Sequence, residues 1–235
     1  MAQLDGQKVL VVGGSSGIGE ATAARLKELG ASVTLASRSR DKLEAAAERI
    51  GGADVAVLDT RSDEGVAQFF ADAPQFDHIV ISAAQTPGGK VKELPLGDAY
   101  AALDSKFWGA YRVARAAQIR PGGTLTFISG FLSVRPGDWV LQGAINAALE
   151  SLARGLALEL SPTRVNAVSP GVIATPLWGG MAEADRQAMF DATAAGLPAK
   201  RIGHPEDIAN AIAYLVMTPY ATGSTVLVDG GGAIA

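Results

Sequence analysis

The sequence predicts an α/β fold in which helices cover both faces of a parallel sheet, and three observations support this. Short runs rich in β-branched residues alternate with alanine-rich segments of helical spacing, a pattern typical of repeated strand and helix units. Several strand segments are apolar almost throughout, as expected when both sheet faces are covered. The first apolar run, 9–12, leads directly into a glycine-rich turn that opens a helix.

Seven segments are predicted as strands and five longer ones as helices. The strands are Lys8–Val12, Ser32–Ala36, Val55–Leu58, His78–Ser82, Thr124–Ser129, Arg164–Ser169 and Thr225–Val228. The helices are Glu20–Leu29, Asp41–Ile50, Val66–Ala71, Ala101–Ile119 and Gln142–Leu160. Because no linker, repeat or low-complexity stretch divides the chain, residues 1–235 are expected to form one doubly wound Rossmann domain with about seven strands.

Composition excludes several classes of protein. No apolar run reaches the roughly 18 to 20 residues that cross a membrane, and no basic segment followed by an apolar stretch opens the chain, so a cytoplasmic protein is expected. The formal charge of −4, without clusters of Lys and Arg, argues against nucleic-acid binding. The chain has no cysteine, and neither histidine has metal-ligand partners at helical spacing, so no metal site is predicted.

The glycine-rich turn has the spacing and context of a phosphate-binding loop. Gly13, Gly17 and Gly19 follow a strand and open a helix. Glycines let the backbone approach a pyrophosphate closely, and the helix N-terminus offers free amides and partial positive charge. A turn that serves packing alone is the alternative, but the context favours a dinucleotide.

With these motifs in view, the sequence resembles the classical short-chain dehydrogenase/reductase family over essentially its whole length. Segment 166–176 is similar to the nicotinamide-side segment of that family, and the ending Thr222, Gly223 and 228–231 is also characteristic. Residues 82–84 read Ser-Ala-Ala where the family has Asn-Ala-Gly, so two positions are altered. The resemblance implies cofactor contacts at Gly13, Ser15, Ser16, Gly17, Ile18, Gly19, Asp59, Thr60, Ser82, Ala83, Ala84, Asn146, Pro170, Gly171, Val172, Ile173 and Thr175.

The residues after the second strand favour NADP(H) over NAD(H). An acid at this place would pair with ribose hydroxyls and repel a 2′-phosphate. The chain instead carries Ser37, Arg38 and Ser39, which offer a cation and two hydroxyls. The alternative is that Arg38 is only a solvated loop cation.

The catalytic positions depart from the family pattern. Its members use a Tyr and a Lys four residues apart on one helix, a Ser thirteen residues before the Tyr, and an Asn on the preceding helix. The resemblance places Gln142 at the Tyr position, Asn146 at the Lys position and Lys106 at the Asn position, whereas Ser129 matches the family Ser. Lysine and asparagine are therefore exchanged between two helices.

This exchange leaves two hypotheses of function. In the first, the chain is an NADP(H)-dependent oxidoreductase that acts on a carbonyl or alcohol, with Lys106, Ser129, Gln142 and Asn146 as a rewired site. Gln142 has no titratable proton, so Lys106 or water must complete proton transfer. In the second, the site has decayed, or Lys106 extends to solvent, and the chain binds nucleotide as a sensor, scaffold or partner subunit.

The substrate side and the assembly are expected only from the resemblance. Segment 177–205 resembles a mobile lid, in which Trp178, Met181, Met189 and Phe190 would line an apolar pocket for a small-molecule substrate. The other expected wall residues are Gln85, Phe131, Arg135 and Trp139. A homodimer or homotetramer is expected to pair through 101–119 and 142–160, where Ala147, Ala148, Ser151 and Gly155 allow close approach.

Overall fold

A seven-stranded parallel sheet forms the centre of the computed structural model, which describes residues 3–235. The strands are β1 (Lys8–Val12), β2 (Ser32–Ser37), β3 (Asp54–Val57), β4 (Phe76–Ile81), β5 (Ile119–Ile128), β6 (Arg164–Pro170) and β7 (Thr225–Val228). Their order is β3-β2-β1-β4-β5-β6-β7, so the chain reverses its winding between β1 and β4. The predicted fold class is confirmed.

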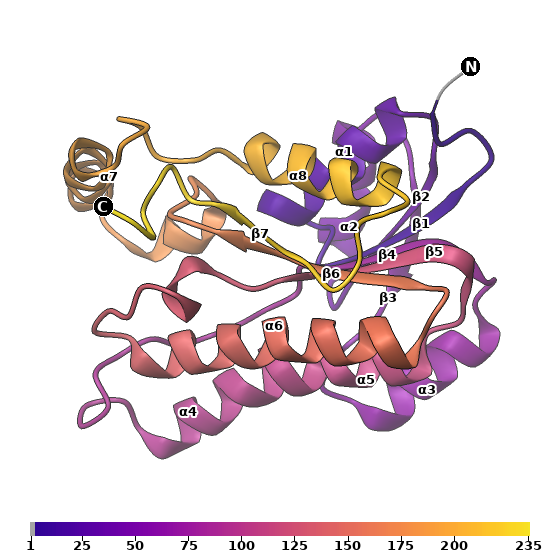
Figure 1. The fold of residues 1–235 in the computed structure, drawn as a ribbon, viewed down its shortest axis with the longest axis horizontal. Helices are drawn as coiled ribbons and strands as arrows, with labels where there is room; N and C mark the ends of the chain where they lie inside the picture. The colour runs from indigo at the N-terminus through magenta and orange to yellow at the C-terminus, as the bar shows by residue number, and fades with distance from the viewer. Residues whose placement is uncertain (1–2) are drawn as a thin grey trace.

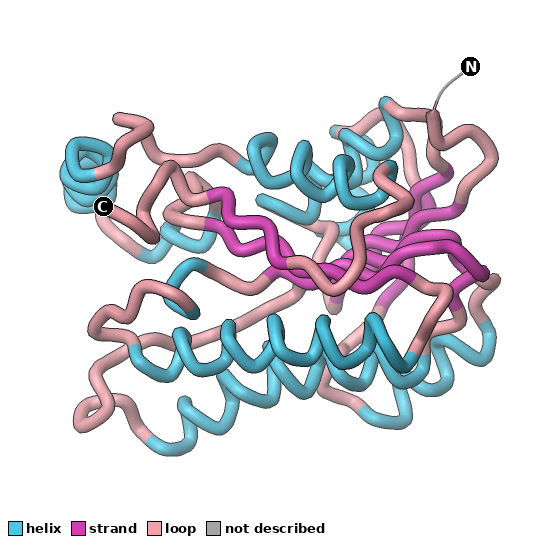
Figure 2. The backbone as a smooth tube through the Cα atoms, viewed as in Figure 1, coloured by secondary structure: helices cyan, strands magenta, loops and turns pink. Residues whose placement is uncertain are grey.

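Helices cover both faces of this sheet (Figure 1). The helices are α1 (Gly17–Glu28), α2 (Arg40–Arg49), α3 (Asp63–Asp72), α4 (Leu96–Leu103), α5 (Gly109–Ala116), α6 (Val140–Glu159), α7 (Glu183–Gly196) and α8 (Pro205–Met217). On one face lie α1, α2 and α8, and on the other lie α3 to α6, whereas α7 stands apart at one end of the molecule (Figures 1 and 2).

The buried residues of β1 show how the sequence pattern builds these layers. Val9 and Val11 point into the core beneath α1, α2 and α8, while Leu10 and Val12 point into the core on the opposite face. All four are fully buried. Successive strand residues face opposite sides of a sheet, so a strand covered on both sides needs apolar residues at every position.

The region between β4 and β6 differs from the sequence prediction. The expected single helix Ala101–Ile119 is divided into α4, a π-helical turn η1 (Asp104–Trp108) and α5, and it ends at Ala116. The prediction was wrong at its C-terminal end because Ile119 already begins β5 and pairs with Phe76 of β4. Between Phe76 and His78 the pairing of these strands shifts register, so local apolar spacing alone did not reveal the start of β5.

Two helices were not predicted. Helix α7 lies within segment 177–205, which was expected to form a lid, and α8 begins at the last residue of that segment. The start of α8 carries a visible signal, because Pro205 occupies its first turn and the Asp207 carboxylate accepts a hydrogen bond from the His204 backbone amide (2.8 Å). Among residues 3–235, no helix has the length and hydropathy needed to cross a membrane.

Candidate active site

A cavity of about 770 Å³ opens at the carboxyl ends of the strands, beside the point where the winding reverses. Ligands of open α/β sheets bind at such a switch point. The lining includes most residues expected to contact cofactor and all four expected catalytic residues. Gly19, Val172 and Arg135 do not line it.

The glycine loop provides one wall of the cavity. Gly13 and Gly17 have φ values of +87° and +55°, and a Cβ on Gly13 would lie 2.5 Å from the Ala83 backbone nitrogen. Ser16 precedes α1 but its side chain makes no capping hydrogen bond, so the first amides of this helix keep their donors for a ligand. Gly19 instead packs against the Gly13 carbonyl, which explains its place behind the lining.

Cationic side chains lie at the end of the cavity that follows β2 and β3. Arg38 is exposed there, and the Ser37 hydroxyl is buried without a hydrogen-bond partner among the described residues. Lys42 and Arg61 also line this end, although the sequence analysis did not single them out. Asp59 is engaged by Arg61 (2.9 Å), and this hydrogen bond is the main cause that lowers the pKa of the Asp59 carboxyl.

Lys106 reaches the floor of the cavity from the π-helical turn η1. Its Nζ donates to the Asn146 Oδ1 and to the Ser129 backbone oxygen, each at 2.7 Å. Burial of the ammonium lowers the pKa of Lys106 to about 8, although the nearby Glu150 carboxylate opposes this shift. The expected contact between Lys106 and Asn146 is present.

Ser129 hydrogen-bonds to groups behind the cavity floor. Its hydroxyl faces two acceptors, the Glu150 Oε1 at 2.9 Å and the Val168 carbonyl at 3.2 Å. Glu150 is 7% exposed on α6 and also accepts a hydrogen bond from the Ser133 hydroxyl (2.7 Å). Glu150 was not among the predicted site residues, although its position at helical spacing places a carboxylate on the face of Gln142 and Asn146.

Gln142 is turned toward the segment before α4. Its Nε2 donates to the Pro87 carbonyl at 2.5 Å, which fixes the orientation of the side-chain amide because a carbonyl only accepts. The Gln142 Oε1 is buried and has no hydrogen-bond partner within residues 3–235.

Comparison with known proteins now identifies the family. A family model described as enoyl-(acyl carrier protein) reductase matches residues 12–232. Glucose 1-dehydrogenase of Gluconobacter oxydans is 33% identical, over 96% of this chain and 91% of its own. The chain belongs to the classical short-chain dehydrogenase/reductase family.

Other members of the family agree over the full length. Short-chain dehydrogenase/reductase ATR9 of Stachybotrys chlorohalonatus is 32% identical, over 98% of both chains. The crystal structure of a small-chain dehydrogenase in complex with NADPH is 34% identical and superposes with a TM-score of 0.85, over 98% of this chain and all of that one. These relatives are oxidoreductases, and the family uses a nicotinamide cofactor.

Aromatic side chains form part of the cavity lining. Phe131, Trp139 and Trp178 line the cavity together with Gln85. Trp178 is fixed by a hydrogen bond to the Ile173 carbonyl (2.8 Å) and packs edge-on against Phe190. Of the expected lid residues, Met181, Met189 and Phe190 do not reach the lining.

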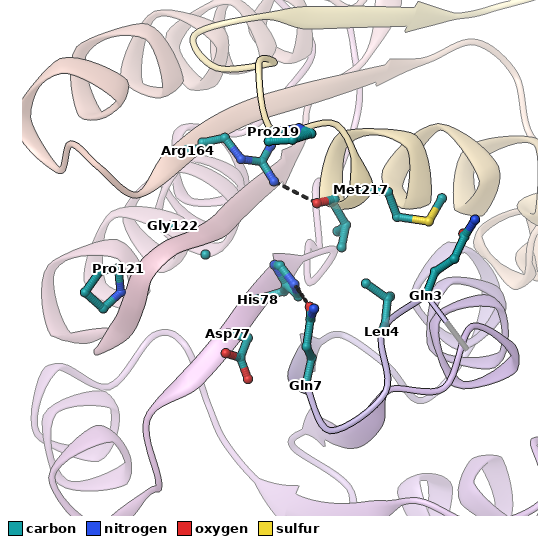
Figure 3. Close-up of a pocket in the computed structure, with 12 residues that line it drawn as sticks. Gln3, Leu4, Gln7, Asp77, His78, Pro121, Gly122, Arg164, Met217 and Pro219 are labelled. Atoms are coloured by element: carbon teal, nitrogen blue, oxygen red, sulfur yellow. Dashed lines mark hydrogen bonds between the residues drawn. The ribbon is translucent and has the colours of Figure 1, made fainter. Parts of the chain in front are cut away.

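A second cavity of about 620 Å³ lies at the opposite end of the strands (Figure 3). Two of its polar side chains, those of Arg164 and His78, are already engaged within the fold. Arg164 donates to the Leu215 and Val216 carbonyls at the end of α8, and His78 contacts the Thr124 hydroxyl (2.9 Å) and the Gln7 side chain (2.5 Å). These contacts give His78 a structural role within the fold. Within residues 3–235, no group of three His, Asp or Glu side chains is placed to hold a metal ion.

Proposed function

We propose that this family member is an NADP(H)-dependent oxidoreductase that acts on a carbonyl or alcohol with Lys106 as its proton-transferring group. The observation that carries the proposal is the Lys106 ammonium at the cavity floor, held by Asn146 and Ser129, with its pKa lowered to about 8. A group that titrates near neutral pH suits general acid and base catalysis.

The residues of the cavity fit a phosphorylated dinucleotide. The free amides at the start of α1 suit a pyrophosphate, and Gly13 leaves backbone space where a side chain would collide with Ala83. The unpartnered Ser37 hydroxyl and the Arg38 and Lys42 cations suit a 2′-phosphate. When bound, the nicotinamide supplies or accepts a hydride.

The chain itself must manage the proton on the substrate oxygen. An ammonium has three donors, and two of those on Lys106 are held by Asn146 and Ser129, which leaves one for a ligand. Asn146 fixes the position of the ammonium, and Gly130 makes room for the Asn146 amide, because a Cβ there would lie 2.6 Å from Nδ2. Lys106 then gives its proton to a developing alcohol or, as a free amine, takes one from it.

Turnover tests this proposal directly. Oxidation of NADPH with a panel of ketones and aldehydes, and reduction of NADP⁺ with the matching alcohols, should both be measurable. Replacement of Lys106 by Met should lower kcat by about 10²- to 10⁴-fold, the usual contribution of a general acid or base. Lys8→Met, at the exposed start of β1, is the matched control and should leave kcat unchanged.

The pH profile gives a second test of the same role. Alcohol oxidation needs the free amine, so its rate should rise with pH through about 8, whereas carbonyl reduction should fall over the same range. Identical profiles for the wild type and Lys106→Met would refute proton transfer by Lys106.

One observation favours the alternative of nucleotide binding without turnover. The Ser129 hydroxyl and the Gln142 amide both donate to groups of the fold, so two positions that bind substrate in the family are directed elsewhere. Tight NADPH binding without turnover of any member of either panel would establish this second function.

A further inference from the structure

Two polar positions on the cavity floor offer acceptors where substrate-binding donors are expected in this family. We infer that this site selects a ligand with a hydroxyl hydrogen over one with a bare carbonyl. The inference rests on the proposed function for its assumption that substrate binds at this floor. It adds the class of group that the floor recognises.

The first acceptor is the Gln142 Oε1. The Pro87 carbonyl can only accept, so Nε2 of Gln142 must face it, and the oxygen must face away. Gln142 is 8% exposed and lines the cavity, and its Oε1 has no partner within the described chain. A buried carbonyl oxygen without a partner is costly, so a ligand that donates to it gains binding free energy.

The second acceptor is the Ser129 hydroxyl oxygen. This group has a single hydrogen, and both of its neighbours behind the floor, the Glu150 Oε1 and the Val168 carbonyl, are acceptors. Donation to either leaves only lone pairs for a ligand. The Ser133 hydroxyl also donates to Glu150 and helps to hold that carboxylate in place.

Lys106 completes the recognition. Its remaining hydrogen can be donated to the ligand oxygen, while a hydroxyl donates its own hydrogen to Gln142 or Ser129. A hydroxyl therefore satisfies donor and acceptor together, whereas a ketone pairs only with Lys106 and leaves the Gln142 oxygen unpaired. Sites built to accept a hydrogen bond reject analogues that lack the donor.

Binding to the NADP⁺-loaded protein tests this inference without turnover. The probes are two pairs, 1-methylcyclohexanol with cyclohexanone, and 2-phenyl-2-propanol with acetophenone. A tertiary alcohol has no hydrogen on its carbinol carbon to transfer, and a ketone cannot be reduced by an oxidised cofactor, so all four stay intact. Calorimetry should give a dissociation constant at least about tenfold lower for the alcohol of one or both pairs.

Variants locate the source of that preference. Gln142→Met removes the acceptor at similar size, and Ser129→Ala removes the second one; each should reduce the alcohol preference, the former to about twofold or less. Gln68→Met makes the same chemical change on the exposed surface of α3 and should keep the full preference. Using two variants keeps the test available if one fails to fold.

Several outcomes would overturn the inference. These are equal or tighter binding of the ketones, no binding of any probe, or a preference that survives both variants. Failure of the proposed function is distinct. An alcohol preference without turnover of any substrate would refute the oxidoreductase proposal and support this inference. Turnover with tighter ketone binding would support the oxidoreductase proposal and refute this inference.

Discussion

Lys106 and Asn146 lie in contact although they belong to different helical segments, η1 and α6. Family resemblance assigns an amide to the first position and an ammonium to the second, and this chain has the two types exchanged. The 2.7 Å contact means that the exchange keeps one ammonium and one amide at the same place. An ammonium enclosed by protein is costly unless oxygen atoms surround it, and Asn146 and Ser129 provide them.

Restoring the phenol at position 142 tests whether the exchanged lysine can assist it. Gln142→Tyr places a titratable hydroxyl near Lys106, and a nearby ammonium lowers a phenol pKa. Carbonyl reduction should increase by about 10²- to 10⁴-fold in kcat/KM, the usual gain from a general acid. The comparison variant combines Gln142→Tyr with Lys106→Asn and Asn146→Lys. Equal gains would show that Lys106 assists the phenol as well as a lysine at position 146 does, and a gain in the triple variant alone would show that Lys106 cannot assist it.

We expect the preference between NADP(H) and NAD(H) to depend on a small number of cations beyond β2. NADPH should raise the melting temperature more than NADH at equal concentration, because Arg38 and Lys42 line the cavity where a 2′-phosphate is expected. Arg38→Asp should reverse that order by repelling the phosphate and accepting from a ribose hydroxyl. Arg115→Asp, exposed on α5, changes the net charge equally and should not reverse it. Equal shifts with both nucleotides in the wild type would contradict the expected preference.

At the scale of elements, η1 directs Lys106 into the cavity. A π-helical turn adds one residue to a helical turn, which changes the direction of the side chains that follow, and such turns occur often at functional sites. Trp108 and Tyr111 continue the segment on its exposed side with an edge-on ring contact. The sequence had no glycine or proline between 98 and 108 to announce this turn.

Strand β4 carries a histidine whose titration should weaken the fold in acid. Burial lowers the pKa of His78 to about 4 from the ordinary 6.5. Between these values the unfolded chain binds a proton that the folded chain does not, so the free energy of unfolding should fall as pH drops from 6.5 to 4, by about 1–3 kcal/mol. Denaturant titrations across this range should show a smaller decrease in His78→Gln. His204→Gln, at the exposed start of α8, should retain the wild-type decrease.

The elements that could be predicted are those specified by local pattern. The bounds of β1 and β7 were predicted as the structure has them, because apolar runs bounded by turns define buried strands. The contact of Lys106 with Asn146 could be predicted because both residues lie in segments that match the short-chain dehydrogenase/reductase family. The helical spacing places Glu150 on the face of Gln142, but its contact with Ser129 could not be predicted, nor could the contact of Gln142 with Pro87. Both contacts depend on how distant segments pack against one another. Helix α7 was missed because it has no residue that is fully buried and hence a weak apolar stripe.

At the scale of the whole molecule, α4, α5 and α6 lie side by side and form an outer layer (Figure 1). Three aromatic side chains are exposed on this layer, Tyr100 at 68%, Trp108 at 45% and Tyr111 at 40%. On α6 the exposed positions include the small residues Ala147 and Ser151. Large aromatic surface beside a smooth helical face favours association with another protein chain.

We propose that two copies of the chain pair through this layer about a two-fold axis, giving a dimer or a tetramer. Small residues at Ala147 and Ser151 allow the α6 helices of two copies to approach closely, and a two-fold axis brings the same patch of each copy together. Light scattering at micromolar concentration should therefore give a mass of two or four chains. Ala147→Arg should shift that mass toward the monomer, because each two-fold contact would receive two bulky cations. Ala45→Arg makes the same change at an exposed position of α2, on the other face of the sheet, and should keep the wild-type mass. A wild-type monomer, or equal masses for the two variants, would exclude pairing through α6.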